Sequence, residues 1–359
     1  MTTANGIGDT AATPRPARLP LAVTMGDPAG IGLDITLAAW ADRAANPLPA
    51  FVLYGDPQAV AARAEQLGIA IEIGLVEGPL TAHALPPRSL PIKAVRLAGP
   101  ARAGEPDPLN GAAVIAAIEL ATAAVAHGEA SALVTNPISK ATLYAAGFRH
   151  PGHTEFLAEL ALRHWPGCAA VPVMMLASDA LRVVPLTVHI PLSEVPGRIS
   201  GPLIEQTARI LVADLESYFG VSAPRIAVAG LNPHAGEGGT IGREDVDVVA
   251  PAIAALQRSG MNVVGPLSAD TMFHAAARSR YDAAIAMYHD QALIPLKTLA
   301  FDDGVNVTLG LPFVRTSPDH GTAFDIAGTG TARATSFVAA LRLAAQMSDR
   351  ARTRSNVRI

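Results

Sequence analysis

Three histidines occupy the same kind of position, directly after an apolar run typical of a buried strand and before a turn rich in proline or glycine. They are His189 in VVPLTVHIPL, His234 in AVAGLNPHAGEGG and His289 in AIAMYHDQ. Neutral imidazole is the commonest protein ligand for metals, and three imidazoles with one open position are typical of a catalytic zinc site. Taken alone, each histidine fits a hydrogen-bonded structural role. Together, the three fit a shared metal site equally well.

Carboxylates stand close to these histidines in the sequence. Asp290 follows His289 directly, and Asp270 stands in PLSADTMFH. A carboxylate beside a ligating imidazole can orient the ring, contact the metal or move a proton. For Asp270, a helix N-cap ahead of TMFHAAA is the alternative. Lys297 adds a further polar group six residues beyond the strand-like run DAAIAMY and its polar end.

Two other stretches carry groups that are suited to an anion. In HPGHTEFLAELA, His153 and Thr154 open an amphipathic helix, where free N–H groups and the positive end of the helix dipole favour phosphate or carboxylate. Simple capping of the helix is the alternative there. In GVNVTLGLPFVRTSP, Asn306 lies within an apolar run and Arg315 just beyond it. Arginine suits bidentate recognition of phosphate or carboxylate, and a plain salt bridge is the alternative.

The glycine-rich stretch TMGDPAGIGLD, residues 24–34, follows a strand pattern and opens a helix. Such a junction attracts anions to backbone N–H groups. Its glycines, Gly26, Gly30 and Gly32, match neither G-x-G-x-x-G nor a Walker loop. The stretch therefore does not support an ordinary dinucleotide-binding fold.

Alternating strand and helix patterns must position these groups. The apolar runs that predict strands are at 21–25, 51–55, 131–137, 171–176, 182–188, 225–230 and 283–289, and a long amphipathic helix is expected at about 199–219. Strands that alternate with helices predict a mainly parallel sheet covered by helices, an α/β fold. Ligands gather at the carboxyl ends of the strands in such sheets.

Composition excludes several classes of function. The chain has 359 residues, of which 50% are hydrophobic and 16% charged, so it can bury a large core and suggests two domains. A net charge of -4 without a basic face argues against nucleic acid and anionic membranes as partners. The single cysteine, Cys168, excludes an internal disulfide and fits a reducing compartment.

The N-terminal segment, residues 1–20, contains no apolar run long enough for a signal-peptide core. We expect it to be a disordered tail. No later stretch is expected to reach the roughly 18 apolar residues of a spanning helix, which predicts a cytoplasmic protein.

Five motifs in order, TMGDPAGIG, PGHTEFLAE, GLNPHAGEGG, MYHDQ and GVNVTLGLPFVRTSPDHGTAFDIAG, together resemble the 4-hydroxythreonine-4-phosphate dehydrogenases of pyridoxal 5'-phosphate biosynthesis. The resemblance runs from about residue 21 to 347. HGTAFDIAG also resembles isopropylmalate dehydrogenases. This implies a two-domain α/β/α fold of the isocitrate/isopropylmalate dehydrogenase type, which binds NAD without the usual glycine fingerprint. Two departures are small: GIGLD stands where GIGPE is common, and QALIPLK where QGLPVLK is usual.

The resemblance implies a role for each candidate residue. It places a divalent metal, zinc, magnesium or cobalt, on His189, His234 and His289. Implied substrate contacts are His153, Thr154, Lys297, Asn306 and Arg315. Implied cofactor-side residues are Gly26, Asp27, Gly30, His320, Gly321 and Asp325. The catalytic candidates are Lys297, Asp270 and Asp290, with Lys297 in proton transfer or in contact with the substrate carboxylate.

The resemblance also implies an organisation and a reaction. Residues 21–135 and 305–359 would form a cofactor-side domain, and 136–304 a metal, substrate and dimerisation domain. A homodimer would share its active sites, with His289 facing His189 and His234 of the other chain. The expected reaction is metal-assisted oxidation of 4-phosphooxy-L-threonine by NAD, with NADP as the alternative, and decarboxylation to 3-amino-2-oxopropyl phosphate. Two alternatives stay open: a relative that oxidises a phosphorylated four-carbon sugar acid or an aromatic dihydrodiol dicarboxylate, and a non-catalytic protein that binds metal and phosphometabolites.

Overall fold

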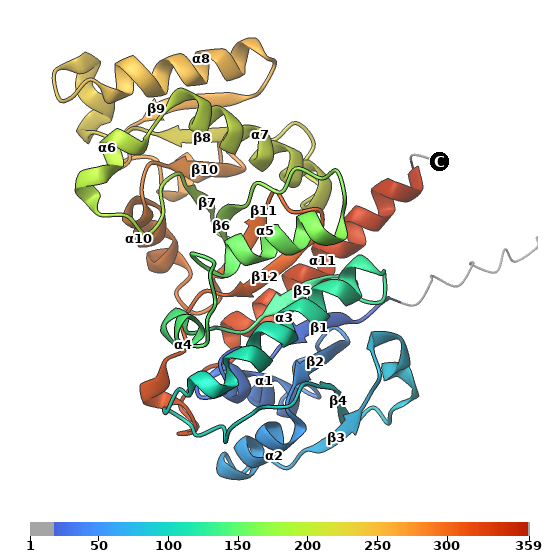
Figure 1. Ribbon diagram of the computed structural model, residues 1–359. Coiled ribbons are helices and arrows are strands. Elements are labelled where there is room, and N and C mark those ends of the chain that lie inside the picture. The colour runs from blue at the N-terminus through green and yellow to red at the C-terminus, as the bar shows by residue number, and fades with distance from the viewer. Residues whose placement is uncertain (1–17, 358–359) are drawn as a thin grey trace, which may run out of the picture.

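One mixed sheet runs through the part of the chain that the computed structural model describes, residues 18–357 (Figure 1). Its twelve strands lie in the order β3-β4-β2-β1-β5-β12-β11-β6-β7-β10-β8-β9. The strands are β1 (Leu21–Thr24), β2 (Phe51–Gly55), β3 (Glu72–Leu75), β4 (Ser89–Ala94), β5 (Leu133–Thr135), β6 (Val173–Ala177), β7 (Arg182–Pro185), β8 (Ile226–Ala229), β9 (Val263–Leu267), β10 (Ala283–Ala286), β11 (Val305–Leu309) and β12 (Arg315–Pro318).

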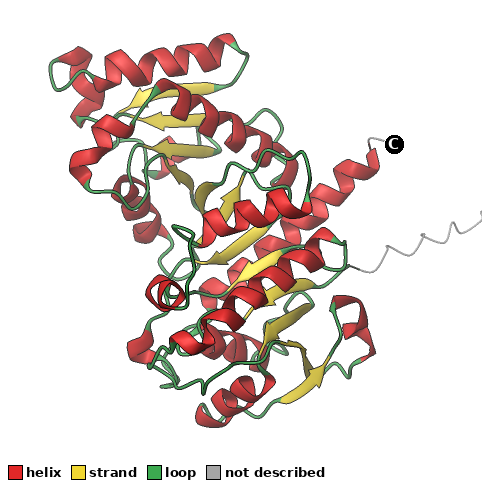
Figure 2. Cartoon of the chain, viewed as in Figure 1, coloured by secondary structure: helices red, strands yellow, loops and turns green. Residues whose placement is uncertain are grey.

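Helices cover the sheet on both sides (Figure 2). They are α1 (Gly32–Ala41), α2 (Pro57–Gln66), α3 (Gly111–Ala126), α4 (Lys140–Ala145), α5 (His153–His164), α6 (Val195–Arg198), α7 (Gly201–Tyr218), α8 (Ala250–Arg258), α9 (Ala275–Arg278), α10 (His289–Leu299) and α11 (Thr335–Val357). Every residue of β1, β8 and β10 is buried, as expected for strands with both faces covered. The α/β class predicted from the sequence is confirmed.

Most neighbouring strands are parallel, also as predicted, and the exceptions lie at the centre of the sheet. β11 pairs antiparallel with both β12 and β6, and β6 pairs antiparallel with β7. β12 in turn pairs parallel with β5. The hairpin of β11 and β12 therefore joins the two halves of the sheet. Both strands come late in the chain, after α10, yet they lie at the centre of the sheet.

The predicted strands are all present, but the pattern missed five others. β3 and β4 lie at one edge of the sheet, and β9 lies at the other. β9 also contains a Gly-Pro step, and β12 reads RTSP, so neither shows the apolar run that predicts a strand. β11 was recognised only as an apolar stretch.

The first described residues are held against the segment that leads into β5. Residues 1–17 of the predicted tail lie outside the described residues. At residues 18–20 the chain is already held, because Ser131 donates its backbone N–H to the carbonyl of Pro20 at 2.9 Å and its hydroxyl to that of Leu19 at 3.0 Å. The predicted division into two domains stays a prediction.

One segment, Pro108–Ala126, has the length and composition of a membrane span. It comprises 19 residues with a mean hydropathy of 1.7, because its alanines keep the hydropathy high. We expected no such stretch, and this segment corrects that expectation. Ala117, Ile118 and Ala121 are buried in α3, which packs on β1 and β2. A helix that packs in a protein core can have the same length and hydropathy as a membrane span.

A buried ion pair fixes the glycine-rich stretch 24–34. Arg63 pairs with Asp34, and both side chains are almost fully buried. The same guanidinium donates to the carbonyls of Gly30 and Pro28, each at 3.0 Å. The second oxygen of Asp34 accepts the backbone N–H of Gly328 at 2.6 Å. One ion pair thus ties the loop after β1 to the loop that follows β12.

Removing one partner of this pair should be strongly destabilising. We expect Arg63→Met to lower the free energy of unfolding by about 3–5 kcal/mol, because Asp34 would stay buried without its counter-ion. Arg209→Met is the matched control, since Arg209 pairs with Glu205 on an exposed helix face and such pairs are worth less than about 1 kcal/mol. Urea unfolding of both variants measures the difference. Equal losses would contradict the structural role of the pair.

Candidate active site

The ends of β7 and β10 bring two of the predicted histidines together. These strands are parallel neighbours, so the segments that follow them leave the same edge of the sheet. The Thr187 hydroxyl donates to the carbonyl of Met287 at 2.8 Å and keeps the two segments in contact. As a result, the ring centroids of His189 and His289 lie 5.5 Å apart.

The surroundings of His189 favour neutral imidazole. Burial lowers the pKa of His189, and the nearby charges of Lys140 and His289 lower it further. Nδ1 of His289 lies 2.7 Å from Oδ1 of Asp290, which leaves Nε2 for another partner. Neutral imidazole is the form that ligates metals, so the donor set fits a divalent ion. A cavity of 250 Å³ lined by both histidines and Asp290 adjoins the pair.

The third histidine, His234, sits in a left-handed turn after β8. Its φ is 53°, and the residues from Ala235 to Gly239 also have positive φ. Such a run is costly for residues other than glycine and persists only where its surroundings enforce it. Asp245 holds the entry to the turn in place, because it accepts the backbone N–H groups of Leu231 at 2.7 Å and of Asn232 at 3.0 Å. The His234 side chain is consequently held at the surface.

A link between strand ends places this turn relative to His289. Gln291 donates from Nε2 to the carbonyl of Gly230 at 2.8 Å and accepts the N–H of Met287 at Oε1 at 2.6 Å. The polar residue directly after the MYHD segment thus joins the end of β10 to the end of β8. The polar side chain of Gln291 thus forms hydrogen bonds between two strand ends. This explains why the buried strand β10 is followed by polar residues.

Within one chain, however, His234 does not complete a cluster with the other two histidines. Its charge contributes to a lowered pKa of Asp270, whose main cause is the hydrogen bond from Ser268. Among the described residues, no group of three or more His, Cys, Asp or Glu side chains is placed to hold a metal. Within the described residues of one chain, His189 and His289 therefore lie together, and His234 does not join them. The metal site itself stays a prediction.

The expected division of ligands between protomers, with His289 facing His189 and His234 of the other chain, stays a prediction. The adjacency of β7 and β10 brings the rings of His189 and His289 together in the same chain. If the site is shared, His234 is the histidine left to come from the partner.

Arg315, at the start of β12, is a buried cation held only by hydroxyl groups. Its side chain faces Thr308 across the hairpin and Thr135 on β5. Nε and Nη2 donate to the Thr135 hydroxyl at 3.2 and 2.6 Å, and Nη1 donates to the Thr308 hydroxyl at 2.9 Å. Arg315 is only 4% exposed, and burial lowers its pKa to about 10. No carboxylate of the described residues forms an ion pair with it, which excludes the salt-bridge alternative within that part of the chain.

His153 lies next to this cation, at the first residue of α5. Its Nε2 is buried and has no hydrogen-bond partner among residues 18–357. Burial holds the pKa of His153 well below its ordinary value, and the Arg315 charge lowers it further. The N-cap of α5 is Gly152, so Thr154 lies inside the helix and does not cap it. The first turn of α5 has no side-chain cap, and its N–H groups remain available for an anion.

Lys297 and Asn306 both lie beside the end of β12, since Lys297 contacts Asp319 and Asn306 pairs with Ser317. Nζ of Lys297 on α10 lies 2.6 Å from Oδ2 of Asp319 and donates to the Asp319 carbonyl at 2.8 Å. Asn306 is half-buried on β11, on the same face as Thr308 and Arg315 because residues two apart on a strand share a face. Its side chain makes no hydrogen bond to the described residues. The predicted substrate contacts thus share the central part of the sheet.

The predicted cofactor-side residues come from two loops that touch. Ile31 donates its N–H to the carbonyl of Thr322 at 2.9 Å. Gly30 is required there, because an added Cβ would lie 2.8 Å from that same carbonyl oxygen. Gly26 similarly packs against the carbonyl of Pro137. These glycines are therefore explained by packing between loops, whether or not they contact a cofactor.

Polar groups in these loops differ in their environment. Asp27 is buried, and burial raises its pKa although it accepts the N–H of Ala29 at 3.0 Å. Gly321 and Asp325 are exposed. Burial also lowers the pKa of His320, whose Nε2 is buried and unpartnered in the described chain. That nitrogen fits a polar group of a bound nucleotide.

Several site residues escaped the sequence analysis. Lys140 and Glu155 influence the pKa of His189. Thr135 contacts Arg315, and Asp319 contacts Lys297. The available signal was the stretch SALVTNPISK, in which Thr135 ends a buried strand and Lys140 follows it as the histidines follow theirs. Asp319 stands inside a recognised motif next to His320, and nothing local distinguishes it.

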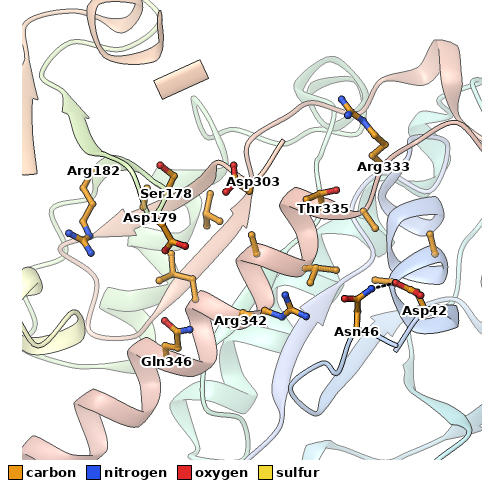
Figure 3. A pocket seen from close by; sticks show the side chains of 18 of the residues that line it. Asp42, Asn46, Ser178, Asp179, Arg182, Asp303, Arg333, Thr335, Arg342 and Gln346 are labelled. Carbon is orange, nitrogen blue, oxygen red and sulfur yellow. Dashed lines mark hydrogen bonds between the residues drawn. The ribbon is translucent and has the colours of Figure 1, made fainter. Parts of the chain in front are cut away.

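A larger cavity, of 760 Å³, lies elsewhere along α11. Figure 3 shows Ser178, Asp179 and Arg182 on one side of it and Arg333 and Thr335 on another. None of the predicted site residues lines this cavity. We place the active site at the strand ends instead, because the unpartnered donors and the histidine pair gather there.

Comparisons with known proteins identify the family of this chain. Residues 48–344 match the family model of the pyridoxal phosphate biosynthetic protein PdxA. A 4-hydroxythreonine-4-phosphate dehydrogenase from Xanthobacter autotrophicus is 54% identical over 93% of this chain and 95% of its own length.

Two solved structures extend the comparison. A 4-hydroxythreonine-4-phosphate dehydrogenase from Klebsiella pneumoniae has a TM-score of 0.83 and 39% identity, over 92% of this chain and 98% of its own. A terephthalate 1,2-cis-dihydrodiol dehydrogenase from Burkholderia xenovorans has a TM-score of 0.60 and 29% identity, over the same shares of both chains. The match of the family model to most of the chain and the identity to these relatives assign this protein to the PdxA family of pyridoxal phosphate biosynthesis.

Proposed function

We propose that this protein oxidises 4-phosphooxy-L-threonine with NAD and a divalent metal, in the cytoplasm, to 2-amino-3-oxo-4-phosphooxybutanoate. This β-keto acid then loses CO2 and gives 3-amino-2-oxopropyl phosphate for pyridoxal 5'-phosphate. The relatives named 4-hydroxythreonine-4-phosphate dehydrogenase support the reaction. NADP is the alternative cofactor.

The observation that carries the proposal is the buried Arg315 guanidinium, which has no carboxylate partner among residues 18–357. A buried charge of this kind is unfavourable unless a counter-ion completes its surroundings. His153 offers an unpartnered nitrogen beside it, and Asn306 an unpaired amide on the same face. A phosphate bound here would satisfy all three groups. The neighbouring helix N-terminus of α5 favours the same charge.

The histidine pair fits the metal that this reaction would use. When bound, the metal would polarise the substrate's C3 hydroxyl, while NAD would accept the C3 hydride. His189 and His289 would hold the ion from one chain, and the partner's His234 would complete the set in a homodimer. Asp290 lies against Nδ1 of His289 and would orient that ring, and Asp270, whose pKa the His234 charge helps to lower, would contact the metal or move a proton.

Lys297 is the group we assign to the proton of the substrate hydroxyl or to the substrate carboxylate. Asp319 fixes its Nζ with a side-chain and a backbone oxygen, so the amine approaches the substrate in one orientation. His320 would contact the cofactor from the adjoining loop. Gly26, Asp27, Gly30, Gly321 and Asp325 would shape the rest of that side.

Two alternatives have support of their own. The similarity to a terephthalate dihydrodiol dehydrogenase supports a relative that oxidises an aromatic dihydrodiol dicarboxylate, whose carboxylates would use the same donors. A phosphorylated four-carbon sugar acid would also fit a phosphate site. A non-catalytic binding protein is less consistent with the complete set of candidate residues. NADH formation across a panel of these hydroxy acids separates the proposed reaction, the other oxidations and the non-catalytic binding protein.

The phosphate should dominate substrate choice. We expect kcat/KM for unphosphorylated 4-hydroxythreonine to be at least about a hundredfold below that for its 4-phosphate, because two lost charge-assisted hydrogen bonds cost about 1.5–3 kcal/mol each. Arg315→Met should narrow this ratio, whereas Arg333→Met, at a distance from the site, should not change it. Comparable efficiency on both substrates in the wild-type protein would contradict the phosphate site and favour the dicarboxylate relative.

The proposed sharing of ligands can be tested by mixing inactive variants. Mixed His189→Ala and His234→Ala protomers should form hybrid dimers with one intact site, which gives about a quarter of the wild-type activity after random exchange in a two-fold dimer. Mixed His189→Ala and His289→Ala protomers should recover none, because both ligands come from the same chain. Native mass spectrometry reports the exchange. Recovery in the second mixture, or in neither, would exclude this arrangement.

Metal content provides an independent check on His234. The His234→Ala variant should stay folded and lose most of its bound divalent metal, because two remaining imidazoles are fewer than a catalytic site requires. His83→Ala, an exposed histidine in another part of the chain, is the control. Elemental analysis of both dialysed variants measures the effect. Wild-type metal content in His234→Ala would remove it from the ligand set.

A further inference from the structure

The hydrogen bonds around Arg315 leave a defined set of donors free. A guanidinium carries five N–H groups, and three of them are used by the hydroxyls of Thr135 and Thr308. The remaining two are one on Nη1 and one on Nη2. Two N–H groups on neighbouring terminal nitrogens match two oxygens of one oxyanion. The contacts with Thr135 occupy the edge formed by Nε and Nη2, so a ligand would meet the edge formed by Nη1 and Nη2.

The Thr135 hydroxyl keeps its O–H donor free, because Arg315 uses only its acceptor positions. A hydroxyl has two acceptor positions and one donor, and the bonds from Nε and Nη2 of Arg315 occupy both acceptor positions. Thr135 is fully buried, and its O–H has no acceptor among the described residues. Because Arg315 pairs with Leu133 and strand residues two apart share a face, Thr135 and the Arg315 side chain lie on one face of the sheet.

From this geometry, and resting on the proposed function, we propose that Thr135 is the positioning residue that makes the site selective for a phosphate monoester. It fixes the Arg315 guanidinium from Nε and Nη2, with Thr308 as the second support, and directs the two free N–H groups toward the ligand. The Thr135 O–H then meets a third oxygen. A phosphate has three terminal oxygens for these donors, whereas a carboxylate has only two.

The proposal distinguishes phosphate from carboxylate substrates within one binding site. The same Arg315 could bind the carboxylate of a dihydrodiol dicarboxylate by its two free N–H groups. It would leave the Thr135 O–H unpaired in a buried position, which is unfavourable. The hydroxyl is therefore the feature of the chain that favours a tetrahedral anion.

Thr135→Val tests this role, because valine keeps the shape and removes the hydroxyl. We expect KM for 4-phosphooxy-L-threonine to rise about tenfold or more, as for the loss of one buried hydrogen bond, with kcat changed by less than about threefold. KM for NAD should not change. Thr135→Ser, which restores the hydroxyl, should return KM to within about threefold of wild type.

Two further variants make the test specific. Thr308 supports Arg315 through one hydrogen bond, whereas Thr135 accepts two. The Thr308→Val variant should therefore show a smaller rise in KM than Thr135→Val. Thr316→Val is the matched control, since Thr316 adjoins Arg315 on β12 but its hydroxyl donates to the Ala340 carbonyl at 2.9 Å. The control should leave both KM values at the wild-type level. A wild-type KM in folded Thr135→Val, or an equal rise in the Thr316 control, would overturn the proposal.

A binding measurement separates this proposal from the proposed reaction. Inorganic phosphate should raise the thermal unfolding temperature of the wild-type protein and of Thr135→Ser, and acetate at equal ionic strength should not. Thr135→Val should lose most of the phosphate effect. If the protein oxidises no substrate but shows this pattern, the reaction is wrong and the anion site stands. If oxidation is normal and phosphate and acetate act alike in all variants, the role of Thr135 is wrong.

Discussion

The pairing of β11 with β12 is the constraint on which the rest of the molecule depends. The hairpin inserts between β5 and β6, so the two groups of mainly parallel strands become one sheet only through it. Its register places Arg315 opposite Thr308 and Asn306 opposite Ser317. A slip by one residue would move these side chains to the other face of the sheet. The same backbone hydrogen bonds therefore hold the fold together and aim the anion-binding groups.

The two most buried arginines of the described residues, Arg63 and Arg315, differ in whether a carboxylate neutralises their charge. Arg63 has a carboxylate, Asp34, and two backbone carbonyls, so its charge has a counter-ion inside the protein. Arg315 has only neutral hydroxyls, and its pKa is lowered to about 10. Burial alone thus does not distinguish a structural cation from a binding cation. The presence or absence of an internal counter-ion does.

Part of this arrangement was readable from the sequence. His189, His234 and His289 follow apolar runs, and parallel strands end at one edge, so their gathering on one side of the sheet could be expected. The pairing of His189 with His289 in one chain could not, because it depends on β7 and β10 being neighbours, which no local pattern encodes. The left-handed turn at His234 was hidden for a similar reason. It is imposed by Asp245, eleven residues later, against the preference of the residues in the turn.

The residues around Arg315 show where such inference ends. Arg315 itself was recognisable because an arginine beside an apolar run is unusual. Thr135 was not, since a threonine at the end of a buried strand fits a strand equally well. Its role follows only from contact with a residue 180 positions away. Asp319 escaped for the same reason, because Lys297 reaches it from another helix.

The place of β12 beside β5 also has a consequence for how the chain is made. Synthesis must continue for 180 residues after Thr135 before Arg315 exists, which takes about ten to forty seconds at roughly 5–20 residues per second. During that interval β5 has one open edge, and α11, which packs on β5, β12 and β11, has not emerged. The N-terminal half therefore leaves the ribosome as an incomplete sheet. The open edge of β5 is covered only when β12, near the end of the chain, has been made.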